Sequence, residues 1–130
     1  MFNNLIVLIP AFNEEMEIEI VISGVKKFAT PLVVDDGSTD QTWSIANTAG
    51  AIVLKHSKNF GYEKALETGF EYFKNSNYTY LITLDADSQH DPEMIGEFYD
   101  NLCNGFDCVV GVRDKLQRTG EYMFAYVSKL

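Results

Sequence analysis

The stretch that decides the fold is LIVLIPAFNEE, residues 5–15. Its first five residues form a continuous β-favouring apolar run that Pro10 stops, which predicts a strand buried on both faces. Polar residues follow at once, and the segment 15–28 then places apolar residues on one helical face: Ile18, Val21, Ile22 and Val25. A buried strand, a polar loop and an amphipathic helix in this order make one β–α unit.

The same unit recurs along the chain. Further strands are predicted at 32–34, 51–54, 80–84 and 107–111, and further helices at 39–49, 61–73, from Asp91-Pro92 onward, and from about 115 to 130. Regular alternation with short connections requires right-handed crossovers and a parallel sheet. We therefore expect an α/β fold: a mostly parallel sheet with helices on both faces, Rossmann-like in its arrangement.

Composition narrows the class of protein. The 130 residues suffice for one domain, 46% are apolar and 22% are charged, which excludes a disordered tail, a collagen-like repeat and a membrane bundle. A net charge of −9 argues against a nucleic-acid partner. Cys103 and Cys108 have no companions at metal-ligand spacing and are interpreted as free thiols. With no signal peptide and no apolar stretch near 20 residues, we expect a cytoplasmic protein.

Polar segments follow each of the first four predicted strands. In an open α/β sheet, ligands bind beyond the carboxyl ends of the strands, where the strand order reverses. The segments that would meet along this edge are 10–15, 35–40, 56–61 and 85–90. Their convergence is stronger support for a site than any one of them alone.

Asp85-Ala86-Asp87 ends the fourth predicted strand. Residues two apart in an extended segment point to the same side, so the two carboxylates repel each other unless a cation lies near them. Mg²⁺ and Mn²⁺ take oxygen ligands and bridge carboxylates to phosphates. Gln89 offers a further neutral oxygen. The alternative is that Asp85 caps a turn and Asp87 is solvated.

Asp35 and Asp36 are adjacent and face opposite ways. One can accept hydrogen bonds from its own loop, and Asp36 can accept from a ligand N–H such as the ring imide of uracil or guanine. A plain turn with a helix cap is the alternative. Lys58, beside the helix that begins near Gly61, is a plausible phosphate neighbour. His56 and His90 are interpreted as structural or solvent-facing rather than as ligands.

Several common nucleotide and hydrolase motifs are missing from the sequence: G-x-x-x-x-G-K-[ST], G-x-G-x-x-G after the first strand, and G-x-S-x-G. A phosphoacceptor receiver domain shares the length and the acidic residues. Receivers, however, carry their acidic pair after the first strand, whereas Asp35-Asp36 follow the second. A non-catalytic binding module on the same fold is the other alternative.

Four motifs together resemble the family 2 glycosyltransferases of GT-A fold. They are Ile9-Pro10-Ala11-Phe12-Asn13-Glu14-Glu15, Val34-Asp35-Asp36-Gly37-Ser38-Thr39-Asp40, Asn59-Phe60-Gly61 and Asp85-Ala86-Asp87-Ser88-Gln89-His90-Asp91-Pro92. The last is most similar to dolichol- or polyprenyl-phosphate sugar synthases. The match extends from Leu5 to about Arg113. Two departures stand out: Val112 replaces the serine of the family's Gly-Ser-Arg segment, and Glu63-Lys64 replace small residues.

The resemblance implies a UDP- or GDP-linked sugar donor. The residues it places on the donor are Pro10, Ala11, Asn13, Glu14, Asp36, Asp85 and Arg113. Lys58, Gly61 and Ala86 are expected at the same nucleotide-sugar site. Asp87 and Gln89 would hold Mg²⁺ or Mn²⁺, and Asp85 and Asp87 would serve in catalysis. The implied reaction is an inverting transfer to a polyprenyl phosphate or a saccharide, as in the synthesis of cell-envelope polysaccharide or glycolipid.

In family members the acceptor side and any catalytic base lie beyond the donor half, where this chain stops. We therefore expect residues 1–130 to form a single GT-A domain that is incomplete at its C-terminus. A lipid-phosphate acceptor would place the full-length protein at the cytoplasmic face of the membrane.

Overall fold

A computed structural model describes residues 1–88, 91–112 and 122–127. Its elements along the chain are β1 (Leu5–Ala11), α1 (Ile18–Lys26), β2 (Thr30–Asp35), α2 (Thr42–Thr48), β3 (Ile52–Lys55), α3 (Tyr62–Lys74), β4 (Tyr80–Thr83), α4 (Met94–Cys103), β5 (Cys108–Val112) and β6 (Tyr122–Val127). The sheet order is β3-β2-β1-β4-β6-β5. Because β3, β2, β1 and β4 pair in parallel, the predicted α/β class is confirmed.

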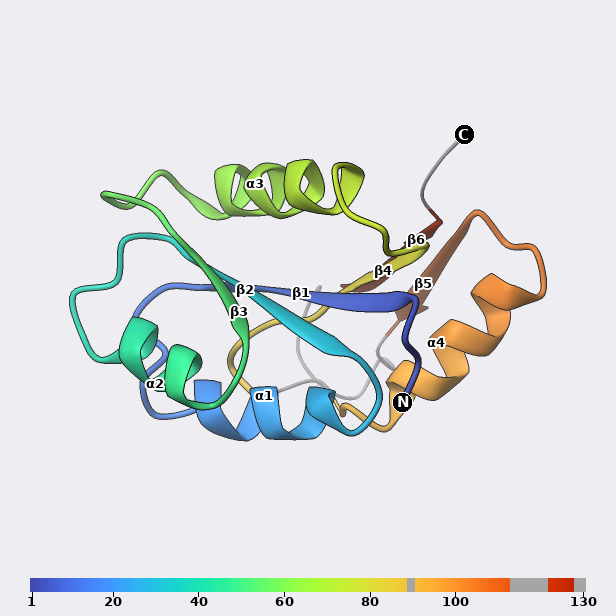
Figure 1. Cartoon of the computed structure of the whole chain (residues 1–130), viewed down its shortest axis with the longest axis horizontal. Coiled ribbons are helices and arrows are strands. Elements are labelled where there is room, and N and C mark those ends of the chain that lie inside the picture. Colours follow the sequence, from blue (N-terminus) through green and yellow to red (C-terminus); the bar gives the residue numbers. More distant parts are fainter. Residues whose placement is uncertain (89–90, 113–121, 128–130) are drawn as a thin grey trace.

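Helices cover both faces of the sheet (Figure 1). Successive residues of β1 point to opposite faces, so Leu5, Val7 and Ile9 pack against α1 and α4, while Ile6 and Leu8 pack under α3. All five side chains are fully buried. This strand is therefore the double-sided centre of the core, as its uninterrupted apolar run predicts.

Pro10 does not end β1, contrary to expectation, because the strand continues to Ala11. Pro10 pairs in register with Val34 of β2. The backbone nitrogen of Pro10 faces the same side as the Leu8 carbonyl, which accepts the Leu84 N–H. On that side β4 ends at Thr83, opposite Leu8, so no ladder bond is lost where proline lacks its N–H.

The predicted helix over 115–130 is wrong where the structure describes it: 122–127 form strand β6. β6 pairs antiparallel with both β4 and β5. The open side of β4 offers a row of backbone partners, and the β-favouring sequence YMFAYV fills it, so tertiary pairing decides the outcome. β5 thus runs parallel to β4 without pairing with it, and the β–α alternation of the described elements stops at β5, which β6 follows.

Helix boundaries differ from expectation by a few residues. α1 begins at Ile18 rather than at Glu15, because the N–H groups of Glu17 and Ile18 first close a turn onto the Glu14 carbonyl. α4 begins at Met94, after a turn in which the Met94 N–H bonds to the Asp91 carbonyl. These turns determine where α1 and α4 begin next to the edge of the sheet.

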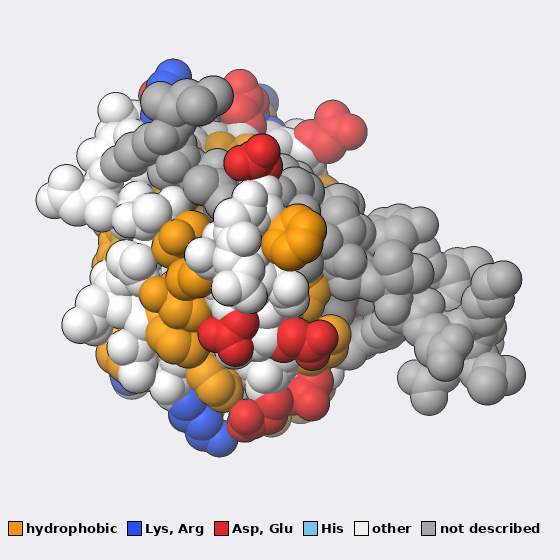
Figure 2. Space-filling model, turned by 90° about the vertical axis from the view of Figure 1, so that its right-hand side faces the viewer, with side chains coloured by type: hydrophobic (Ala, Val, Ile, Leu, Met, Phe, Trp, Pro, Cys, Tyr) orange, Lys and Arg blue, Asp and Glu red, His pale blue; other side chains and the backbone are white. Residues whose placement is uncertain are grey.

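The surface is acidic, in keeping with the net charge of −9. Seen from the side of α4, it carries several Asp and Glu side chains next to apolar ones (Figure 2). Among the described helices, none combines the length and apolarity needed to cross a membrane.

Candidate functional site

The strand order reverses at β1, which lies between β2 on one side and β4 on the other. The chain leaves β1 for β2 and β3, and then returns through α3 to β4 (Figure 1). Loops at such a switch point diverge and leave a crevice at the carboxyl ends of the strands. The predicted polar segments that follow β1, β2 and β4 therefore border this crevice.

The loops after β1 and β2 are interlocked by hydrogen bonds. The Asn13 N–H donates to Ser38 Oγ over 2.9 Å, and the Thr39 N–H donates back to Asn13 Oδ1 over 2.9 Å. Close by, the Glu14 N–H donates to Thr42 Oγ1 over 2.8 Å. Asn13 adopts a φ of 53°, a conformation that asparagine tolerates better than most residues. The two loops thus form one rigid wall.

The carboxylates of Asp35 and Asp36 accept hydrogen bonds from two different loops. Asp35 Oδ1 accepts the Ser38 N–H over 3.0 Å, which confirms the predicted return of one aspartate into its own loop. Asp36 is only 3% exposed, and its two oxygens accept the N–H groups of Phe60 and Gly61, each over 2.9 Å. Its contact with a ligand base stays a prediction.

His56 lies behind Asp36. Its Nδ1 is 2.7 Å from Asp36 Oδ1, and its Nε2 is 2.8 Å from Thr68 Oγ1 of α3. The predicted structural role of His56 therefore agrees with its position. Through these contacts Asp36 connects the end of β2 to the start of α3, so the α3 N-terminus is fixed relative to the crevice.

Asp36 should make stability depend on pH. Burial raises the pKa of Asp36, but the N–H groups of Phe60 and Gly61 and the His56 ring outweigh it and hold the pKa below the ordinary 3.8. The unfolded chain therefore takes up this proton first as the pH falls. The stabilisation is present above pH 3.8 and is lost as the pH falls through the lower, folded pKa.

Asp36→Asn is accordingly expected to reduce the free energy of unfolding by about 2 kcal/mol near neutral pH, since one buried N–H loses its charged acceptor. The gap between the two proteins should close as the pH falls below the ordinary pKa of aspartate. Urea unfolding across that range measures it, with exposed Asp100→Asn as the control. A gap that stayed constant with pH would contradict the assignment.

A group of carboxylates surrounds Glu14. Partial burial raises the pKa of Glu14 above its ordinary 4.5, and neighbouring negative charges add to the rise; in decreasing order they are Asp87, Glu17, Asp40 and Asp85. These acids come from the segments that follow β1, β2 and β4, so negative charge gathers at this edge of the sheet. A hard cation would relieve this repulsion and suits such oxygen ligands.

The donor set fits a divalent cation in its chemistry, although it does not form a closed cage. Within residues 1–88, 91–112 and 122–127, no three acidic, histidine or cysteine side chains gather at ligand distance. Gln89, predicted as the second ligand, lies outside the described residues, as does Arg113. An open arrangement with one or two carboxylate ligands is typical of Mg²⁺ sites completed by water and substrate phosphates.

The remaining predicted residues are placed as follows. Pro10 and Ala11 belong to β1 itself and are buried, and Ala86 is 4% exposed. Lys58 is exposed, with its Nζ 5.3 Å from the centre of the Phe60 ring. Gly61 caps α3 with a φ of 104°.

The sequence reasoning missed two residues that contact the acidic segment after β4. The Tyr62 hydroxyl lies 3.3 Å from Asp85 Oδ1, and Glu17 Oε2 lies 2.7 Å from Ser88 Oγ. A polar residue at the start of a helix, Tyr62 as the first residue of α3 and Glu17 just before α1, was the available signal for both.

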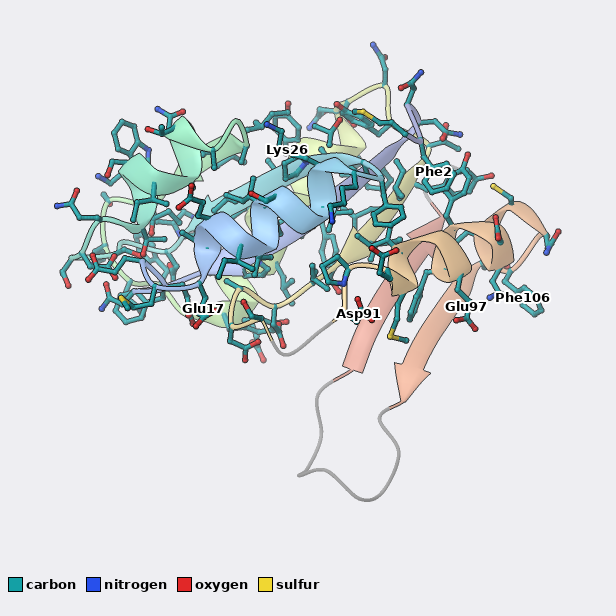
Figure 3. All side chains as sticks on the ribbon, turned by 90° about the horizontal axis from the view of Figure 1, so that it is seen from below. Phe2, Glu17, Lys26, Asp91, Glu97 and Phe106 are labelled. Atoms are coloured by element: carbon teal, nitrogen blue, oxygen red, sulfur yellow. The ribbon has the colours of Figure 1, made fainter. Side chains whose placement is uncertain are left out.

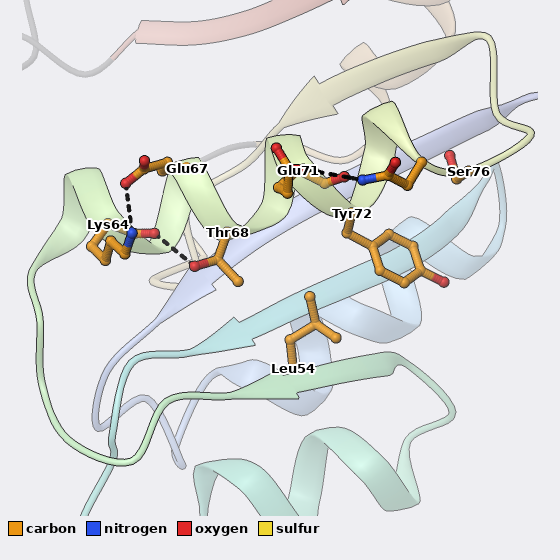
Figure 4. Close-up of a pocket in the computed structure, with 8 residues that line it drawn as sticks. Leu54, Lys64, Glu67, Thr68, Glu71, Tyr72 and Ser76 are labelled. Atoms are coloured by element: carbon orange, nitrogen blue, oxygen red, sulfur yellow. Dashed lines mark hydrogen bonds and ion pairs between the residues drawn. The ribbon is translucent and has the colours of Figure 1, made fainter.

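Cavities occur elsewhere on the molecule. One of about 690 Å³ lies between α3 and the edge strand β3 (Figure 4); it is lined by Leu54, Lys64, Glu67, Thr68, Glu71, Tyr72, Asn75 and Ser76. None of these is a predicted site residue. The predicted metal and phosphate site lies at the carboxyl ends of the strands and not in this groove.

Comparison with known proteins points the same way. The family model for glycosyl transferase family 2 matches residues 6–124. An uncharacterized protein of Methanocaldococcus jannaschii, MJ1222, is 38% identical over 114 residues, which cover 85% of this chain and 47% of the relative. The dolichol-phosphate mannosyltransferase of Pyrococcus furiosus is 32% identical over 116 residues, or 82% of this chain and 32% of the relative. The chain therefore spans half or less of these relatives.

Among solved structures, glucosyl-3-phosphoglycerate synthase from Mycobacterium tuberculosis, crystallised with Mn²⁺, UDP and glucosyl-3-phosphoglycerate, superposes with a TM-score of 0.70. The two are 24% identical, and the match covers 81% of this chain and 42% of that one. This likeness establishes the fold. The receiver arrangement is not found, because the acidic pair ends β2 rather than β1.

Proposed function

Because the chain belongs to glycosyl transferase family 2, we propose that it is the donor-binding part of a glycosyltransferase that uses a nucleoside-diphosphate sugar. The observation that carries this proposal is that Glu14, Asp85 and Asp87 follow strands that meet at the switch point, where burial and, after it, the charges of Asp87 and Asp85 raise the pKa of Glu14. Carboxylates at neighbouring strand ends suit a cation that also binds a diphosphate.

Each loop has a part in this proposal. The loops after β1 and β2, locked together at Asn13, form the wall for the nucleoside. Asp36, whose oxygens also accept the N–H groups of Phe60 and Gly61, is the residue proposed to contact the base there. Lys58 and the N–H end of α3 lie toward the phosphates. Asp85 lies against ribose or sugar, and Asp87 with Gln89 would hold Mg²⁺ or Mn²⁺. When bound, such an ion supplies Lewis-acid stabilisation to the diphosphate.

The reaction proposed is an inverting displacement. An acceptor oxygen forms a bond to the anomeric carbon from the far face, and the bond to the diphosphate oxygen breaks, so that the nucleoside diphosphate leaves with the electron pair. A lipid-phosphate acceptor is already anionic and needs no base, whereas a sugar hydroxyl needs one. The mannosyltransferase named for dolichol phosphate supports the lipid-phosphate acceptor, and with it a role in glycolipid synthesis at the cytoplasmic membrane face.

A thermal-shift screen tests the proposal. UDP, GDP and CDP and their sugars, each with and without Mn²⁺, are compared at millimolar concentration. One nucleotide is expected to raise the unfolding temperature only when Mn²⁺ is present, because a ligand at 100 times its Kd adds about 2.7 kcal/mol to stability. If no nucleotide shifts the transition in either condition, the proposed function fails. Binding without transfer to any acceptor would instead indicate a non-catalytic module.

A further inference from the structure

The acidic segment after β4 is held at both ends by hydroxyl–carboxylate hydrogen bonds. At its start, the Tyr62 hydroxyl donates to Asp85 Oδ1 over 3.3 Å. At its other end, the Ser88 hydroxyl donates to Glu17 Oε2 over 2.7 Å. Asp87 lies between the two attachment points, so the segment is tethered two residues before and one residue after the predicted metal ligand.

The tethers come from opposite faces of the sheet. Tyr62 is the first residue of α3, which covers one face, and Glu17 directly precedes α1, which covers the other. Figure 3 shows Glu17 at the start of α1. The segment 85–88 is therefore held between two helices that do not touch each other, and its position is set by the sheet that both helices pack on.

The anchor of Tyr62 is itself rigid. The N–H groups of the two preceding residues, Phe60 and Gly61, donate to the buried Asp36 carboxylate. This fixes the backbone at the point where α3 begins. Tyr62 is 54% exposed, so its side chain is not fixed by burial, and its hydroxyl reaches Asp85 from the solvent side.

The segment needs such support for two reasons. Asp85 and Asp87 are like charges two residues apart, and their charges add to the effect of burial in raising the pKa of Glu14, so a fixed backbone is needed to keep these carboxylates near one another. In addition, Ser88 has a φ of 60°, a left-handed conformation that is costly for a serine unless its surroundings fix it. The Glu17 carboxylate provides that fixed contact.

We propose that Tyr62 and Glu17 are positioning residues that hold Asp85 and Asp87 at the spacing a cation and a nucleoside diphosphate require. This inference rests on the proposed function. Tyr62 orients the Asp85 carboxylate by occupying one of its oxygens, and Glu17 fixes the backbone just beyond Asp87. Neither side chain needs to touch the ligand.

The test uses four variants of the chain. Tyr62→Phe keeps the ring and removes the hydroxyl, and Glu17→Ala removes the second tether. Glu17→Gln keeps an oxygen that can accept from Ser88, so it separates a tether from a direct charge effect. Tyr72→Phe, elsewhere on α3, is the matched control. Mn²⁺ binding alone is followed by electron paramagnetic resonance, and UDP or GDP binding is titrated with Mn²⁺ and with EDTA.

Tyr62→Phe and Glu17→Ala are expected to weaken Mn²⁺-dependent nucleotide binding about 10-fold, the lower range for residues that orient metal ligands. Binding in EDTA and the metal-free unfolding temperature should stay unchanged, which a merely structural role would not give. Glu17→Gln should retain most of the affinity.

Three outcomes would overturn the inference. Variants that bind like Tyr72→Phe would show that the tethers do not matter. A loss in Glu17→Gln as large as in Glu17→Ala would make Glu17 a direct ligand instead. If the unmodified chain binds neither Mn²⁺ nor nucleotide, the proposed function fails and this inference fails with it.

Discussion

The Asp87→Ala protein is expected to lose Mn²⁺-dependent nucleotide binding, with a drop in affinity of at least about 100-fold, because it removes a proposed ligand and not merely an orienting contact. Asp87 lies in the turn after β4, outside the core, and its charge adds to the repulsion on Glu14. The free energy of unfolding without metal should therefore change by no more than about 1 kcal/mol.

Calorimetric titration with Mn²⁺ and the nucleotide found in the screen measures the loss, and urea unfolding measures stability. Asp100→Ala on α4 is the matched control, since it removes an exposed carboxylate far along the chain from the crevice. Retained metal dependence in Asp87→Ala would show that the cation, if bound, is held elsewhere. A collapse of stability would mean that Asp87 is a structural residue.

The second large effect is expected at Gly37, where Gly37→Ala should destabilise the protein by about 2–4 kcal/mol. Gly37 has a φ of 73°, which an alanine adopts only with strain. A Cβ added there would also lie 2.5 Å from the backbone nitrogen of Asn59 and would contact the Lys58 backbone. Backbone cannot rotate away as a side chain can, so the loop after β3 would have to move.

Gly96→Ala provides a control of opposite sign. Gly96 lies inside α4, and nothing stands within 4 Å of the position its Cβ would take. Alanine is the better helix former by up to about 1 kcal/mol, so this variant should be slightly more stable. Urea unfolding of both variants measures the two changes in the free energy of unfolding. Equal effects at the two glycines would contradict the close contact between the loops after β2 and β3.

The parallel half of the fold follows from the sequence because its signals are local. The apolar run of β1 and the one-sided apolar pattern of α1 each specify an element without help from distant residues. β6 could not be predicted in this way. Its residues 122–127 are compatible with helix or strand, and the open side of β4, remote in sequence, decides between them.

For the site, the sequence predicts only which residues lie at the ends of the strands. Polar segments after the first four strands place Glu14, Asp36 and Asp85 at one edge, as expected from the topology. What the pattern does not contain is pairing between side chains. That Asp36 would accept from Phe60 and Gly61, or that Tyr62 would reach Asp85, depends on where α3 begins relative to β4.

Pro10 has a consequence for how the crevice keeps its shape. Two neighbouring strands that both offer donors and acceptors tend to lengthen their ladder, and the loops beyond them are drawn together. At Pro10 the backbone has no proton to offer on the side that faces the end of β4. The ladder between β1 and β4 therefore gains no bond from the backbone nitrogen of Pro10, whatever side chains the flanking loops carry.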